Sequence, residues 1–75
     1  MNMNRLMEVD GMRLRKLRRE HAWSQRDLAS VSGVAQDTIT RLETEQREAQ
    51  PRTVRRLAEA LGVEPRELMK GENCG

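Results

Sequence analysis

Aromatic residues and cysteine are almost absent from this 75-residue chain, which has one Trp, no Phe, no Tyr and a single cysteine, Cys74. One cysteine excludes an internal disulfide and a cysteine-based metal site. No apolar run approaches the roughly 20 residues that span a bilayer, and the first residues show no signal-peptide pattern. We therefore expect a cytoplasmic protein without membrane association. Because β-branched residues nowhere alternate with polar ones, strands are not expected.

The residues that enzymes need are scarce as well. His21 is the sole histidine, Cys74 lies beside the C-terminus, and no glycine-rich phosphate loop occurs. A nucleophile paired with a base, or a nucleotide-binding loop, is therefore not available. We expect a protein that is not an enzyme, with no cofactor and no metal.

Charged residues, in contrast, make up 35% of the chain, beside many Leu and Ala. This composition is typical of short amphipathic helices in one small domain. The net charge is only +2, but basic residues cluster within 13–19 and again within 41–56, while residues 59–72 are acidic on balance. Such local clusters attract phosphate even where the whole-chain charge is small, although solvated helix faces produce the same pattern.

The most informative stretch runs from residue 25 to residue 43 and predicts two short helices joined by a tight turn. Ala29 is small enough to let the two helices cross closely, and Gly33 provides the positive φ that such a turn favours. Ile39 and Leu42 are three residues apart and lie on one face of the second helix. Together with Gln25, which begins the first helix, these residues form a specific combination.

This combination resembles the helix-turn-helix of the Xre/Cro-type repressor family, over about residues 12–69. The resemblance implies an all-α fold, a compact five-helix bundle of the lambda-repressor-like DNA-binding type. It also implies a structural ion pair between Arg18 and Glu43, which ties the first helix to the third.

Capping residues predict the helix boundaries. Asp10 begins the first helix, Ser24 starts the second with a capping box, and Pro51 opens the fourth, which ends at Gly62. Pro65 begins a short fifth helix. Residues 1–9 show no cap and no periodicity and are expected to form a flexible arm, residues 10–70 the helix-turn-helix domain, and residues 71–75 a disordered tail.

Residues 36–43 are the expected recognition helix, placed in the major groove of double-stranded DNA. Gln36 can bond both N6 and N7 of adenine, Arg41 can reach guanine or a phosphate, and Asp37 can accept from cytosine or serve only the helix N-terminus. Gln25 is placed for a phosphate, and the resemblance puts Arg47 and Arg52 along the DNA backbone. The expected DNA-contacting residues are Gln25, Gln36, Asp37, Thr38, Thr40, Arg41, Arg47 and Arg52.

A single domain of this size makes few base contacts, so a homodimer on a palindromic operator is expected. Its interface is predicted from four apolar residues that could equally close the monomer core: Leu61, Val63, Leu68 and Met69. The predicted function is a sequence-specific transcriptional regulator, such as a repressor or the controller protein of a restriction–modification system. A controller that touches RNA polymerase would use Glu43, Glu45 and Glu48. The alternative is a protein-interaction module, such as an antitoxin that binds a cognate partner protein.

Overall fold

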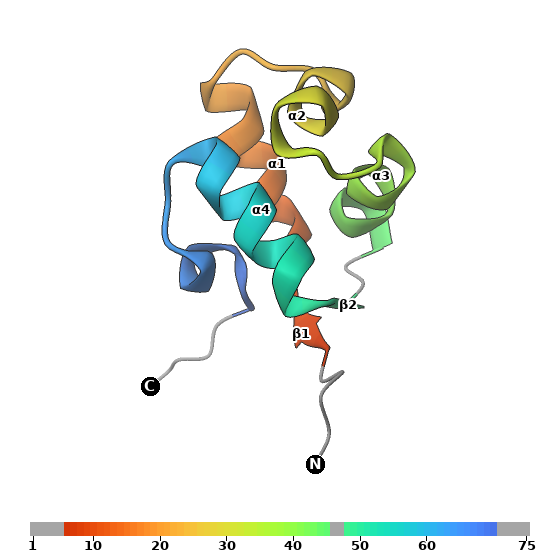
Figure 1. Ribbon diagram of the computed structural model, residues 1–75, viewed down its shortest axis with the longest axis vertical. Helices are drawn as coiled ribbons and strands as arrows, with labels where there is room; N and C mark the ends of the chain where they lie inside the picture. Colours follow the sequence, from red (N-terminus) through yellow and green to blue (C-terminus); the bar gives the residue numbers. More distant parts are fainter. Residues whose placement is uncertain (1–5, 46–47, 71–75) are drawn as a thin grey trace.

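The computed structural model describes residues 6–45 and 48–70 and contains four α-helices, one 3₁₀ helix and a two-stranded sheet (Figure 1). In chain order the elements are β1 (Met7–Glu8), α1 (Gly11–Glu20), α2 (Gln25–Ser32), α3 (Gln36–Glu45), β2 (Glu48–Ala49), α4 (Pro51–Leu61) and the 3₁₀ helix η1 (Pro65–Leu68). The helical fold is therefore confirmed.

The predicted capping residues lie at the ends of the helices. The Asp10 side chain accepts a hydrogen bond from the Arg13 amide, and Ser24 forms a reciprocal capping box with Asp27. Gly33 ends α2 with a φ of 77°, and Gly62 ends α4 with a φ of 76°. This left-handed conformation is accessible to glycine without the steric cost that a Cβ imposes.

One hydrophobic core forms between the helices. α1 packs against α3 and η1, while α2 packs against α3 and α4, so α3 contacts both helices that precede it. One face of α4 is buried in this core: Val54, Leu57, Ala58 and Leu61 are no more than 3% exposed. The buried apolar residues are Val9, Leu14, Leu17, Leu28, Val34, Ile39, Leu42, Ala49, Val54, Leu57, Ala58, Leu61 and Leu68.

The prediction of a five-helix bundle is wrong for its last member, because the described residues contain four α-helices. The fifth helical segment, Pro65–Leu68, is a single 3₁₀ turn in which the Glu67 amide donates to the Glu64 carbonyl and the Met69 amide to the Arg66 carbonyl. Pro65 at its first position fits the prediction, but four residues are too few for α-helical hydrogen bonding.

The flexible arm predicted for residues 1–9 is wrong for its C-terminal part. Met7 and Glu8 pair with Ala49 and Glu48 in an antiparallel sheet, and Val9 is 1% exposed in the core. Two main-chain hydrogen bonds also join residues 8–10 to the C-terminal part of the fold. The Asp10 amide donates to the Leu68 carbonyl at 2.7 Å, and the Lys70 amide donates to the Glu8 carbonyl at 3.1 Å. A strand of two residues is too short to show alternation in the sequence. Residues 1–5 and the tail 71–75 lie outside the described residues.

Gly11, which the sequence did not single out, allows α1 to approach α3 closely. A Cβ at this position would overlap the backbone carbonyl oxygen of Leu42 and lie 3.1 Å from the Cα of Glu43. The first turn of α1 is thereby held against the backbone of α3, which fixes the distance between the two helices.

The described segments, 6–45 and 48–70, carry neither a membrane-spanning helix nor a cluster of metal-ligating side chains. No helix there is long and apolar enough to cross a membrane. The same segments contain no group of three or more His, Cys, Asp or Glu side chains that could hold a metal ion.

Candidate nucleic-acid interface

α3 has one buried face and one exposed face. Ile39 and Leu42 are at most 1% exposed, and Glu43 is 7% exposed. Gln36, at the start of the helix, and Arg41 are exposed. The helix is thus anchored by its inner side chains while its outer side chains are presented to solvent, as an element that enters a groove of DNA requires.

The ion pair implied between Arg18 and Glu43 is present and buried. The Arg18 Nε donates to Glu43 Oε2 at 2.8 Å and Nη2 donates to Oε1 at 2.9 Å, with side-chain exposures of 9% and 1%. The remaining terminal nitrogen, Nη1, donates to the Trp23 carbonyl at 2.7 Å. One guanidinium therefore joins α1, α3 and the segment that leads into α2, in the two-pronged geometry that only arginine provides.

Gln25 and Thr40 extend this pair into a network of four side chains. The Gln25 Nε2 donates to Glu43 Oε1 at 3.0 Å, and the Thr40 hydroxyl donates to Gln25 Oε1 at 2.8 Å. Because the carboxylate can only accept, the amide nitrogen of Gln25 has to face Glu43 and its oxygen has to face Thr40. The orientation of the Gln25 amide is therefore fixed from both sides.

The network also determines the charge state of its members. Burial alone would raise the pKa of Glu43, but hydrogen bonds from Arg18 and Gln25, together with the charges of Arg18 and Arg15, outweigh burial and lower it. The pKa of Arg18 is raised, chiefly by its hydrogen bond to Glu43. Both groups are thus charged near neutral pH, and the pair has no net charge.

The exposed face carries the residues predicted to read bases. Gln36 is exposed at the first position of α3. Asp37 and Arg41, one turn apart, form a solvent-exposed ion pair with an oxygen-to-nitrogen distance of 3.5 Å. Thr38 is half-buried and, with Arg41 and Glu48, lines a shallow depression of about 300 Å³ beside β2. These four residues of α3 thus reach solvent, whereas the hydroxyl of Thr40 is bonded to Gln25.

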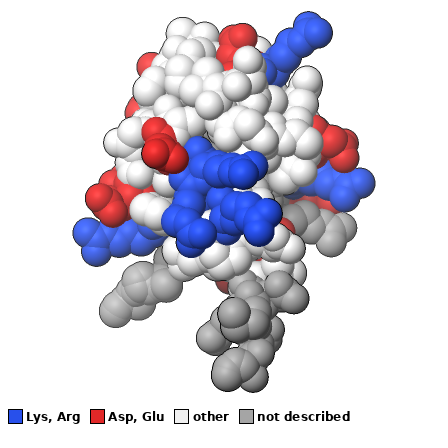
Figure 2. Space-filling view, viewed as in Figure 1, with Lys and Arg blue, Asp and Glu red and all other residues white. Residues whose placement is uncertain are grey.

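Two arginines, Arg47 and Arg52, were predicted to lie along the DNA backbone. Arg52 is exposed on the first turn of α4, and Arg55 and Arg56 are exposed one turn further along. Figure 2 shows Lys and Arg side chains gathered on the face of the molecule where α4 lies in Figure 1. Arg47 lies outside the described residues.

Two sets of predicted contacts need correction. Leu61 and Leu68 are 3% and 1% exposed, so they close the monomer core and have almost no surface for a dimer interface, while Val63 and Met69 are half-buried. A monomer core and an interface draw on the same apolar residues, and sequence alone does not separate the two uses. Glu43 is buried in its ion pair and is excluded from a surface for RNA polymerase, whereas Glu45 and Glu48 are exposed.

Other contacts were not predicted. The Trp23 carbonyl accepts from Arg18, and the Trp23 ring stacks on His21 with centroids 4.4 Å apart. The imidazole Nε2 of His21 lies 3.0 Å from the Leu61 carbonyl, which links the end of α1 to the end of α4. The link between Gln25 and Thr40 joins residues fifteen apart on different helices. No periodicity in the sequence marks such pairs, because they depend on how the helices cross.

Comparison with known proteins agrees with this geometry. A family model described as helix-turn-helix (HTH_3) matches residues 14–68. The restriction–modification controller protein C.AhdI from Aeromonas hydrophila is 41% identical, with a TM-score of 0.73 over 79% of this chain and 89% of that chain. A hydroxyethylphosphonate dioxygenase mutant is 26% identical with a TM-score of 0.76, but only 15% of that chain is covered. No curated protein sequence matches. The chain belongs to the Xre-type helix-turn-helix family of DNA-binding transcriptional regulators.

Proposed function

We propose that this protein regulates transcription by binding a specific operator, with the exposed face of α3 in the major groove. The observation that carries the proposal is the division of α3 into a face locked by the buried network and a face whose polar side chains reach solvent. A fixed helix that presents free donors and acceptors is what direct readout of base edges requires. The protein is not expected to be an enzyme, and the cytoplasm is its expected location.

Base readout is assigned to Gln36 and Arg41. The Gln36 amide can donate to and accept from adenine together, and the Arg41 guanidinium can make the equivalent pair of bonds with guanine or contact a phosphate. Asp37 pairs with Arg41 in the free protein. Its carboxylate therefore orients that guanidinium and repels phosphates that approach in a wrong register.

Phosphate contacts position the helix without reading sequence. Gln25 uses one amide hydrogen on Glu43, which leaves its second N–H for a phosphate at the N-terminus of α2. Thr40 is placed to hold that amide rather than to contact a base, because its hydroxyl hydrogen is already donated to Gln25. Arg52 and Arg47 remain the proposed contacts on the other side of the groove.

A homodimer on a palindromic operator remains our proposal, since one domain contacts few base pairs. Val63 and Met69 are the predicted interface residues that keep exposed surface. The similarity to a restriction–modification controller protein favours the controller branch over an antitoxin. In that branch, Glu45 and Glu48 are the candidates for contact with RNA polymerase, and reversing both charges should abolish activation while the protein still binds its promoter fragment.

Fluorescence anisotropy with DNA from the protein's own promoter region tests the proposal. The native fragment should bind far more tightly than scrambled DNA of the same composition, with affinity falling steeply as salt rises. A stoichiometry of two chains per fragment would establish the dimer. Weak and equal binding to both DNAs would contradict operator recognition and support the protein-interaction alternative.

A further inference from the structure

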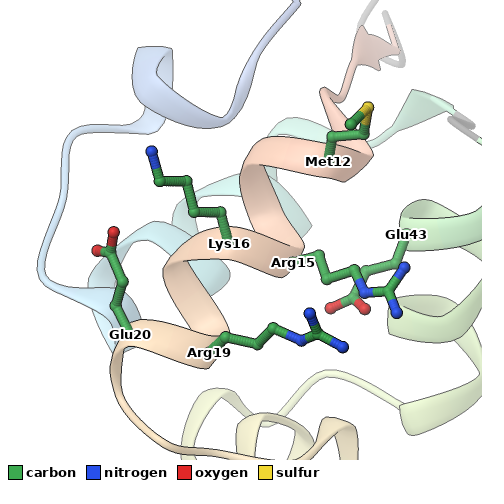
Figure 3. A pocket seen from close by; sticks show the side chains of 6 residues that line it. All are labelled: Met12, Arg15, Lys16, Arg19, Glu20 and Glu43. Carbon is green, nitrogen blue, oxygen red and sulfur yellow. The ribbon is translucent and has the colours of Figure 1, made fainter.

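The outer side of α1 carries a cationic depression that none of the proposed contacts uses. It has a volume of about 550 Å³ and lies where α1 passes α3. Figure 3 shows the side chains of Arg15 and Arg19 extending from α1 toward Glu43, while Lys16 and Glu20 point elsewhere. The residues that line the depression are Met12, Arg15, Lys16, Arg19, Glu20 and Glu43.

The positive charge of this depression is not balanced from within. Glu43 is the carboxylate nearest to the two guanidiniums in Figure 3, but Arg18 already binds both of its oxygens. Among residues 6–45 and 48–70, Arg15 and Arg19 form no ion pair. Arg13, on the same helix, differs because it pairs with Glu67 at 3.1 Å. Arg15 acts on Glu43 only through its charge, so Arg15 and Arg19 present two guanidiniums without an ion-pair partner among the described residues.

The location of these charges suggests their ligand. Glu43 contacts Gln25, the residue that offers an amide hydrogen to a phosphate. Arg15 and Arg19 approach Glu43 from α1, so the three groups surround one buried carboxylate. Residues four apart on a helix lie on the same side, about 6 Å apart along the axis. Two guanidiniums in this arrangement can follow a DNA strand from one phosphate to the next.

We propose that Arg15 and Arg19 form a phosphate subsite that binds the same DNA strand as Gln25. This inference rests on the proposed function, because it takes α3 to be in the major groove. The subsite adds affinity but no sequence preference, since phosphates are the same in every sequence. An acidic segment of a partner protein is the competing occupant. Continuity with Gln25 favours DNA.

The test is the salt dependence of DNA binding by the full-length Arg15→Gln/Arg19→Gln variant. Each phosphate contact contributes about 0.9 to the slope of log K against log[salt], so the slope should become about 1.8 less steep. Affinity should fall for the native promoter fragment and for scrambled DNA by the same factor, leaving their ratio unchanged. The matched control, Arg13→Gln/Arg66→Gln, removes the same charge from the region of η1 and should keep the wild-type slope.

The outcomes separate the subsite from the proposed function. An unchanged slope in the Arg15→Gln/Arg19→Gln variant, with the wild type still preferring its promoter, would overturn the subsite alone and point to an acidic protein partner. An equal loss in the control variant would also overturn it, because net charge would then account for the effect. A wild type without preference for its promoter would overturn both. Matching urea midpoints for all three proteins establish that folding is unaffected.

Discussion

The two faces of α3 differ in how their charges are held. On the inner face, Arg18 and Glu43 form two hydrogen bonds with side chains at most 9% exposed. On the outer face, Arg41 and Asp37 meet at 3.5 Å with exposures of 67% and 78%. The inner pair is buried and held by two hydrogen bonds, whereas the outer pair is exposed, so its members can exchange each other for another partner.

This difference shows how one short helix combines rigidity with recognition. A buried ion pair loses much of its Coulomb energy to desolvation, so its main effect is to exclude other arrangements, while its rupture leaves an unpaired buried charge. An exposed pair contributes little to folding, which leaves its members free to bind a ligand.

Breaking the inner pair should have the largest effect. Arg18→Met leaves the buried Glu43 carboxylate without its guanidinium and should lower the free energy of unfolding by about 3–5 kcal/mol. Urea denaturation followed by circular dichroism measures this loss. The matched control is the double variant Arg18→Met/Glu43→Leu, which removes both charges and should recover most of the stability. A double variant as unstable as the single one would show that the pair itself stabilises the fold.

Separating α1 from α3 should be the next most costly change. In Gly11→Ala the new Cβ would overlap the Leu42 carbonyl oxygen, so α1 and α3 have to move apart. This should lower the free energy of unfolding by about 2 kcal/mol. Met12→Ala, at the neighbouring exposed position, should change stability by less than about 0.5 kcal/mol. Equal unfolding midpoints for the two variants would contradict the close approach seen at Gly11.

Acid should weaken the inner face selectively. The folded pKa of Glu43 is lowered, so its stabilising effect is complete above the ordinary Glu range and is lost as the pH falls through the folded value. Denaturation midpoints measured from neutral to acidic pH should therefore decline more in the wild type than in Glu43→Gln. Asp27, whose pKa the Ser24 backbone and hydroxyl lower, contributes a decline that both proteins share. Parallel profiles would contradict the role of Glu43.

The outer pair should matter least for folding. Asp37→Ala removes one exposed carboxylate and should change the free energy of unfolding by no more than about 0.5 kcal/mol. Its effect should instead appear in DNA binding, where affinity for scrambled DNA rises more than affinity for the promoter fragment. A loss of stability above 1 kcal/mol would show that Asp37 is mainly structural.

Much of the fold could be predicted because it is encoded locally. The signals that mark the helices lie within one turn of the residues they affect. They are the capping residues Asp10 and Ser24, the glycines that end α2 and α4, and the spacing of apolar residues along each helix. The ion pair between Arg18 and Glu43 came from the family resemblance, since no local pattern joins residues 25 positions apart.

The rest depends on distances across the fold. The sheet between β1 and β2 consists of main-chain hydrogen bonds that no side-chain pattern marks. The burial of Leu61 and Leu68 depends on how η1 folds back over α4. The hydrogen bond from Thr40 to Gln25 requires the crossing of α2 and α3. It leads us to propose that Thr40, predicted from the sequence as a DNA contact, supports Gln25 instead.

The most direct test of the central claim is the ratio of affinities for promoter and scrambled DNA, measured by anisotropy with Gln36→Ala/Arg41→Ala beside the wild type. Each lost base contact should cost about 1–3 kcal/mol of discrimination, so the ratio should fall by at least tenfold while the urea midpoint stays unchanged. An unchanged ratio in a stably folded variant would contradict the claim that the outer face of α3 reads the operator.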